Sequence, residues 1–219
     1  MTIARLFTLT AICLTSVFII FGQAKQITKD EYYTPFRASL QKERSISRRK
    51  VSTSENYKDG KLSRTVEWIY EYLVPDTIRY QNTETFEGKR RRVEQININK
   101  AIYCRRDSGD WKISQSSCVG GTGSGISNVV SSRYSIEKAN LNGKKMMLYQ
   151  QYTIYKDSYS INSDKEGLSY WEAKYWLNDE GLIIREESKS GLIEPHRINR
   201  FTVDTYEYNP KLKIEAPIK

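Results

Sequence analysis

Hydrophobic and polar side chains alternate most regularly between Leu62 and Ile113. Within this stretch the alternation has a period of two, which is typical of strands with one buried face. The aromatic and aliphatic face of the first strand consists of Val66, Trp68, Tyr70 and Tyr72. Two glutamates lie on its other face. The pattern predicts an antiparallel sheet whose aromatic face needs a cover.

The remaining chain is also rich in strand patterns. Asn142-Gly143 is its strongest hairpin signal, because this pair favours a tight two-residue turn. A glycine-rich segment, residues 119–125, is interpreted as a flexible loop, and a short helical turn is expected near Ile126–Ser131. The expected strands are Ile46–Tyr57, Leu62–Val74, Thr77–Phe86, Arg91–Asn99, Ala101–Arg105, Trp111–Ser114, Arg133–Leu141, Lys144–Lys156, Ser169–Leu177, Leu182–Ser188 and Arg197–Tyr208.

One helix is expected, over Ile27–Arg44. Thr28 and Glu31 have the spacing of a capping box. Pro35 either kinks this helix or begins a second helix that Thr34 caps. The apolar stripe consists of Tyr32, Phe36 and Leu40. We expect this stripe to cover the aromatic face of the sheet at residues 62–113.

The first 24 residues have the three-part pattern of a secretory signal peptide. Arg5 is their only charge, Leu6–Phe21 is apolar, and Gly22-Gln23-Ala24 provides a small-residue cleavage site. An uncleaved N-terminal anchor is the alternative. Cleavage leaves residues 25–219, enough for a single domain. We therefore expect an exported protein, in the periplasm of a Gram-negative bacterium or, alternatively, extracellular.

Two cysteines, Cys104 and Cys118, follow the expected signal peptide. In an oxidising compartment an isolated pair predicts a disulfide, which would stabilise the fold by about 3 kcal/mol. A metal site would need more ligands, and the single histidine, His196, is distant in the sequence. No metal and no cofactor are expected.

The residue constellations of common enzymes are missing from the sequence. No Gly-x-Ser-x-Gly motif accompanies His196, and the glycine-rich segment lacks the lysine of a phosphate-binding loop. Adjacent acids such as Glu186-Glu187 point to opposite faces of a strand, so they cannot share a substrate. We therefore expect a protein that is not an enzyme.

The formal net charge of the chain is +9. Its basic runs are Arg48-Arg49-Lys50 and Lys89-Arg90-Arg91-Arg92. The export signal argues against a nucleic-acid partner. Contact with an anionic membrane surface, an envelope protein or an anionic glycan is the expected role for such charges, and solvated turns are the structural alternative.

A long sheet with only one helix to cover it leaves apolar surface, which forms either an oligomer contact or a cavity for an apolar ligand. The candidate lining residues of such a cavity are Phe36, Leu40, Trp68, Tyr70, Tyr72, Ile96 and Ile98.

Four segments together resemble the LolA-like superfamily of periplasmic lipoprotein carriers and outer-membrane lipoprotein-sorting proteins. They are Tyr72–Tyr80 with its Pro-Asp turn, Glu94–Lys112 with its Gly-Asp-Trp sequence, Tyr175–Arg185, and Thr205–Asn209 with the Ile214–Pro217 tail. The resemblance implies an α+β fold, in which a curved antiparallel sheet, an incomplete barrel, wraps over one or two helices. It also implies a cavity for acyl chains and no covalent chemistry.

The Cys104/Cys118 pair and the glycine-rich segment do not map onto these carriers. The leading hypothesis is an exported protein that holds a lipid acyl chain, a lipoprotein or another apolar ligand between sheet and helix. The alternative is a structural or interaction protein of the cell envelope, with a filled core and a basic surface that binds a protein or an anionic glycan.

Overall fold

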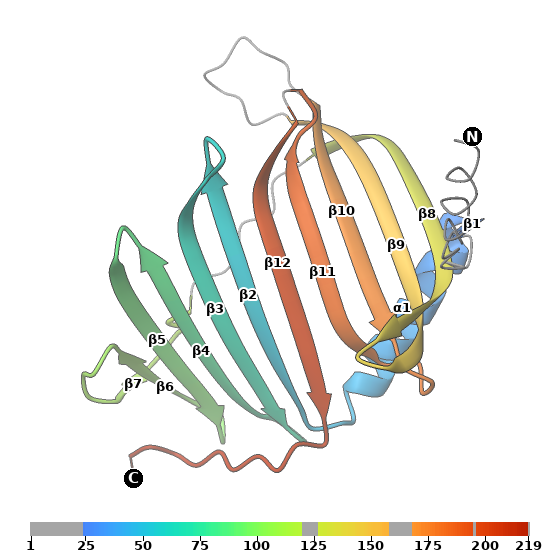
Figure 1. Ribbon diagram of the computed structural model, residues 1–219. Coiled ribbons are helices and arrows are strands. Elements are labelled where there is room, and N and C mark those ends of the chain that lie inside the picture. Colours follow the sequence, from blue (N-terminus) through green and yellow to red (C-terminus); the bar gives the residue numbers. More distant parts are fainter. Residues whose placement is uncertain (1–23, 120–126, 158–167, 195, 219) are drawn as a thin grey trace, which may run out of the picture.

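The computed structural model describes residues 24–119, 127–157, 168–194 and 196–218. In these residues the chain forms a single helix and a twelve-stranded antiparallel sheet (Figure 1). The expected signal peptide, apart from Ala24, and the glycine-rich segment, apart from Val119, lie outside the described residues.

The helix is α1 (Lys29–Glu43). The strands are β1 (Lys25–Ile27), β2 (Arg48–Lys58), β3 (Lys61–Leu73), β4 (Thr77–Phe86), β5 (Lys89–Ile98), β6 (Ala101–Arg106), β7 (Lys112–Ser114), β8 (Ser127–Leu141), β9 (Lys144–Asp157), β10 (Leu168–Leu177), β11 (Ile183–Leu192) and β12 (Arg197–Tyr208).

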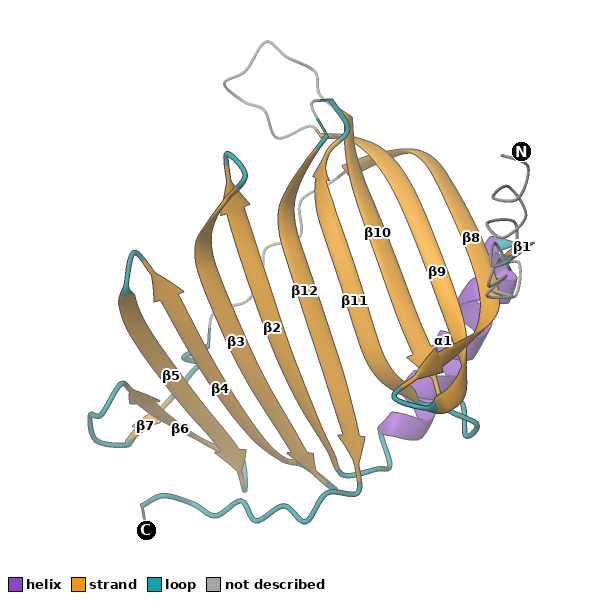
Figure 2. Ribbon diagram, in the orientation of Figure 1, coloured by secondary structure: helices purple, strands orange, loops and turns teal. Residues whose placement is uncertain are grey.

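The order of strands across the sheet is β1-β8-β9-β10-β11-β12-β2-β3-β4-β5-β6-β7. Two meanders, β2 to β7 and β8 to β12, are therefore joined where the last strand pairs with β2. The sheet is strongly curved and stays open, with β1 and β7 at its two edges (Figure 2). This is the curved, incomplete barrel over one helix that the sequence predicted.

Local signals explain where the elements begin and turn. The Thr28 backbone N–H donates to Glu31 Oε2 (2.7 Å), and the Glu31 N–H donates to Thr28 Oγ1 (3.2 Å), so the predicted capping box starts α1. Pro35 lies inside one continuous helix, which excludes a second helix at that point.

Asn142 and Gly143 both have positive φ, 52° and 81°, as the tight turn between β8 and β9 requires.

The helix packs on the half of the sheet formed by β8 to β11 (Figure 1). Phe36 and Tyr32 are buried there together with Leu177 and Ile183. The expectation that α1 covers the sheet of residues 62–113 is therefore wrong. Sequence periodicity identified the helix face and the sheet face correctly as apolar, but it contained no information on which of the two meanders the helix meets.

Three further expectations are corrected. The chain at residues 127–131 begins β8, so the predicted helical turn is absent. A short strand, β1, precedes the helix and pairs with β8 through Ile27 and Tyr134. Leu40 is 55% exposed, because the buried face of the C-terminal turns of α1 is formed by Ser39 and Glu43 instead.

Candidate functional site

Register pairs show which strand positions share the face on which α1 lies, here called the inner face. Tyr175 contacts α1, and it pairs across the strands with Glu186, which pairs with Asp204. Asp204 pairs with Ser52, and Ser52 pairs with Trp68. Directly paired residues of an antiparallel sheet lie on the same face. Trp68 therefore shares the inner face with the residues beneath the helix.

The helix leaves the inner face over β2 to β5 open. A pocket of about 610 Å³ lies there, here called the inner-face pocket. Its lining residues are Lys50, Ser52, Trp68, Tyr70, Tyr80, Gln95, Asn97, Ser117 and Val119. Its volume is in the range of pockets that take small-molecule ligands, about 300 to 1,000 Å³.

The floor of the pocket is a second row of paired residues. Lys50 pairs with Tyr70, Tyr70 with Tyr80, and Tyr80 with Gln95. The rings of Tyr70 and Tyr80 lie 5.0 Å apart at 57°. Burial raises the pKa of both phenols, so both remain uncharged at neutral pH. The floor thus combines aromatic surface with neutral hydroxyl groups.

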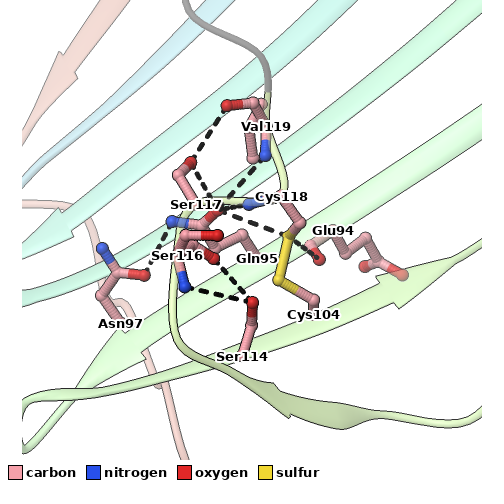
Figure 3. The surroundings of a disulfide bond; sticks show 9 residues. All are labelled: Glu94, Gln95, Asn97, Cys104, Ser114, Ser116, Ser117, Cys118 and Val119. Carbon is pink, nitrogen blue, oxygen red and sulfur yellow. Dashed lines mark hydrogen bonds between the residues drawn. A yellow bond between two sulfur atoms is a disulfide. The ribbon is translucent and has the colours of Figure 1, made fainter.

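One wall of the pocket is formed by the segment after β7, which crosses the inner face at Ser117–Val119 (Figure 3). Gln95 Oε1 accepts hydrogen bonds from Ser117 Oγ (2.9 Å), the Cys118 N–H (2.9 Å) and the Val119 N–H (3.4 Å). A disulfide joins Cys118 to Cys104, the residue that pairs with Gln95 on β6. The predicted disulfide therefore anchors this wall to the row of residues that forms the floor.

The structure separates the seven residues that we expected to line one cavity. Trp68 and Tyr70 line the inner-face pocket. Tyr72 lies on the same face, beside Ile78, but its hydroxyl donates to the Pro75 carbonyl and it is not among the lining residues. Phe36 is buried in the helix core.

Ile96 and Ile98 lie on the opposite face of the sheet, here called the outer face. Ile96 pairs with Arg79, which pairs with Glu71. The residues of β5 that line the pocket are Gln95 and Asn97. The apolar positions of β5 therefore do not face the pocket. Ile96 and Ile98 were expected to line the cavity because they are apolar, but the polar positions that alternate with them, Gln95 and Asn97, do so.

Seven lining residues were not among the sequence candidates: Lys50, Ser52, Tyr80, Gln95, Asn97, Ser117 and Val119. A signal for some of them was present in the hairpin turns. The two-residue turn Glu87-Gly88 fixes the register of β4 and β5, and counting outward from it pairs Tyr80 with Gln95. Turn length combined with periodicity therefore carries information that periodicity alone lacks.

The outer face over β2 to β6 is covered by paired charges. The buried Glu71 is paired with two arginines: its Oε1 lies 3.5 Å from Arg49 Nε, and its Oε2 lies 2.5 Å from Arg79 Nη2. Farther along, the buried Glu94 accepts from Arg92 (2.8 Å) and from Arg105 Nε (2.8 Å). The buried acids of the outer face are thus paired, whereas the pocket lies on the inner face.

The two basic runs have different environments. In the first, Arg48 pairs with Glu43, Arg49 with Glu71 and Lys50 with Asp204. In the second, residues 89–91 are exposed at the β4–β5 turn. The exposed apolar residues Leu62 (55%) and Phe86 (45%) lie at the same end of the sheet as these charges. Only the second run is available to meet an anionic surface.

An acidic pair, Glu186 and Asp204, lies at the boundary between the helix-covered half and the pocket. Burial is the largest cause that raises the pKa of Glu186, followed by the charge of Asp204, while Lys50 and the hydroxyls of Tyr175 and Tyr206 act in the opposite direction. The Lys50 ammonium contacts Asp204 Oδ2. Asp204 Oδ1 is buried without a hydrogen-bond partner in the described chain.

Within the described ranges, no group of three or more His, Cys, Asp or Glu side chains could hold a metal ion. His196 is exposed and stacks on Tyr170 at 5.3 Å, away from the pocket. None of the helices formed by the described residues has the length and apolar character needed to cross a membrane.

Neither protein-family models nor curated proteins match the sequence. Solved structures resemble the fold. The Mycobacterium tuberculosis lipoprotein LppX is 15% identical with a TM-score of 0.46, over 86% of this chain and 100% of that one. LprF from Mycobacterium bovis is 10% identical with a TM-score of 0.44, over 85% and 97%.

A third structure is described as an outer-membrane lipoprotein-sorting protein domain from Vibrio parahaemolyticus. It is 10% identical with a TM-score of 0.27, over 82% of this chain and 93% of that one. The resemblance is one of fold.

Proposed function

We propose that this protein is an exported, non-enzymatic binding protein that holds an acyl chain or another apolar ligand in the inner-face pocket. The observation that carries the proposal is the open half of the inner face. The helix covers β8 to β11, while Trp68, Tyr70 and Tyr80 form a half-buried aromatic surface beside a pocket of about 610 Å³. Aromatic surface of this kind gains free energy when an apolar ligand removes it from water.

The charge distribution supports the same proposal. On the outer face of this half the two buried acids, Glu71 and Glu94, are paired with arginines, so the charges buried there are already satisfied. A disulfide that anchors a pocket wall is typical of a protein in an oxidising compartment, which supports export to a periplasm or to the extracellular space.

The exposed basic turn after Phe86 supports a second part of the proposal, contact with an anionic membrane surface. Lysine and arginine side chains are attracted to anionic head groups, while apolar tips such as Leu62 and Phe86 can enter the interface. Contact of this kind would bring the protein to the lipid phase from which it takes or to which it delivers its ligand.

The ligand-binding function is tested with purified protein and its Trp68→Ala variant. We expect organic extraction of the wild type to release a co-purified lipid that mass spectrometry detects. The uncharged fluorescent probe N-phenyl-1-naphthylamine should bind the delipidated protein, and Trp68→Ala should weaken this binding by about tenfold or more.

Trp111→Ala is the matched control, because Trp111 packs against Arg105 (4.8 Å) away from the pocket. It should bind the probe like the wild type. Absence of both co-purified lipid and probe binding would contradict the proposed function. That result would favour the alternative, an interaction protein of the cell envelope that works through its basic surface.

A further inference from the structure

The chemistry of the inner-face pocket also indicates the class of ligand, and this inference rests on the proposed function. Lys50 is the only charged residue among the described residues that line the pocket. A lysine in an apolar pocket would ordinarily suit the carboxylate of a free fatty acid. The surroundings of this lysine argue against that ligand.

Lys50 is already paired. Its ammonium contacts Asp204 Oδ2 and lies 5.2 Å from the centroid of the Tyr206 ring. Asp204 is only 5% exposed, so solvent screens this pair weakly. A ligand carboxylate would have to displace a buried aspartate from the one ion-pair partner that it has among the described residues, and a buried charge left without its partner is strongly destabilising.

The residue that pairs with Asp204 on the neighbouring strand is also an acid. Glu186 pairs with Asp204 across β11 and β12, on the helix side of the pocket. Asp204 Oδ1 is buried and has no hydrogen-bond partner within the described ranges. Two carboxyl groups thus lie on neighbouring strands, and the Lys50 ammonium that contacts Asp204 also acts on the charge of Glu186. A third carboxylate brought to the pocket from a ligand would be repelled by this pair.

The other polar groups of the lining are uncharged. Gln95 already makes hydrogen bonds within the protein, because its Oε1 accepts from the wall segment and its Nε2 donates to Asn97 Oδ1 (2.9 Å). The Asn97 amide N–H groups and the Ser52 hydroxyl make no hydrogen bond among the described residues. These groups can donate to an ester carbonyl or to a hydroxyl group without introducing charge.

We propose that the inner-face pocket selects uncharged acyl lipids, namely acyl esters or acyl glycerols, over ionised fatty acids. Asp204 is the selectivity residue, because it neutralises the one cation that would recognise a carboxylate. Trp68, Tyr70 and Tyr80 contact the acyl chain, and Asn97 and Ser52 face the neutral ester.

The test compares two ligands with the same acyl chain, monopalmitoylglycerol and palmitate, by calorimetry at mildly alkaline pH, where palmitate is ionised. The wild type should bind the glycerol ester at least tenfold more tightly, which corresponds to about 1.4 kcal/mol. Asp204→Asn releases Lys50 and should raise the affinity for palmitate about tenfold, while the affinity for the ester stays within about twofold.

Asp59→Asn is the matched control, since Asp59 is paired with Arg197 (2.8 Å) at an exposed turn, and it should leave both affinities unchanged. Lys50→Met is the second variant. It should leave palmitate binding as weak as in the wild type, because the ammonium is already neutralised.

The outcomes separate the two proposals. Tighter binding of palmitate than of the ester by the wild type, no gain of palmitate binding by Asp204→Asn, or loss of palmitate binding by Lys50→Met would each overturn the selectivity. Binding of neither lipid, by the wild type or by a variant, would instead overturn the proposed function itself.

Discussion

The ring of Phe36 lies 4.7 Å from the ring of Tyr175, at an interplanar angle of 66°. This edge-to-face contact joins the only helix of the described chain to the β8–β11 half of the sheet. Because the helix is held there, the inner face over β2 to β5 stays open. The position of the pocket therefore depends on a contact in the other half of the sheet.

Phe36→Ala should lower the free energy of unfolding by about 3 to 5 kcal/mol, because it removes a buried aromatic side chain and leaves a cavity. Urea denaturation followed by circular dichroism measures the loss. Leu40→Ala, four residues along the same helix but 55% exposed, is the control and should cost less than about 0.5 kcal/mol. Equal losses in the two variants would show that the helix docks differently.

Tyr32→Phe should stabilise the protein. Tyr32 is 1% exposed, and its hydroxyl has no hydrogen-bond partner in the part of the chain described. Removing a buried, unpaired hydroxyl should raise the free energy of unfolding by about 1 kcal/mol, measured by denaturant titration.

Tyr33→Phe is the matched control with the opposite sign. The Tyr33 hydroxyl donates to Gln151 Oε1 at 3.2 Å, so its removal leaves a buried acceptor unpaired and should cost about 1 kcal/mol. A loss of stability in Tyr32→Phe would indicate that its hydroxyl is satisfied in solution.

Stability should depend on pH through Glu186, whose pKa is raised by burial and by Asp204. The folded protein therefore holds this proton more tightly than the unfolded chain does. The resulting stabilisation is complete below the ordinary pKa of a glutamate and is lost as the pH rises through the raised value. Glu186→Gln should flatten this decline and stabilise the protein at neutral pH.

Denaturant titrations across a series of pH values measure this effect. Glu187→Gln is the control, because Glu187 lies on the outer face beside Arg185 (2.9 Å) and its removal should leave the decline in place. The same pH dependence in wild type and Glu186→Gln would assign the effect to another group.

The double variant Cys104→Ser/Cys118→Ser should lower the free energy of unfolding by about 3 kcal/mol, since the bond closes a loop with a sequence separation of 14 residues. Loss of the bond should also loosen the wall at Ser117–Val119 and weaken binding of the uncharged probe. Thermal unfolding and probe titration measure the two effects. Unchanged probe affinity would mean that the hydrogen bonds of Gln95 hold the wall without the disulfide.

Charge reversal at the β4–β5 turn, Lys89→Glu/Arg90→Glu, should abolish sedimentation with vesicles that contain anionic phosphatidylglycerol. Wild-type sedimentation should weaken as salt is added, because salt screens exposed charges. The control is Lys144→Glu/Lys145→Glu, exposed at the β8–β9 turn, which should still bind. Binding by the first variant, or failure of the wild type to bind, would contradict contact through this turn.

Much of the local structure could be predicted from particular residues. The capping box of Thr28 and Glu31, the turn at Asn142-Gly143 and the alternation around Trp68 depend on neighbouring side chains, and each is found in the structure. The disulfide between Cys104 and Cys118 followed from the number of cysteines. The polar half of the site was not predicted, because Gln95 and Asn97 alternate with Ile96 and Ile98, the apolar positions that the periodicity favoured.

The sequence by itself determined most of the strands, the tight turns and the start of the helix, because these follow from interactions within a few residues. The tertiary structure alone decided which face of β5 looks inward, which half of the sheet the helix covers, and that Lys50 meets Asp204 across two strands that are far apart in the chain. These features depend on strand register and on long-range packing, and the two-residue period of side chains along a strand determines neither of them. The open pocket results from them.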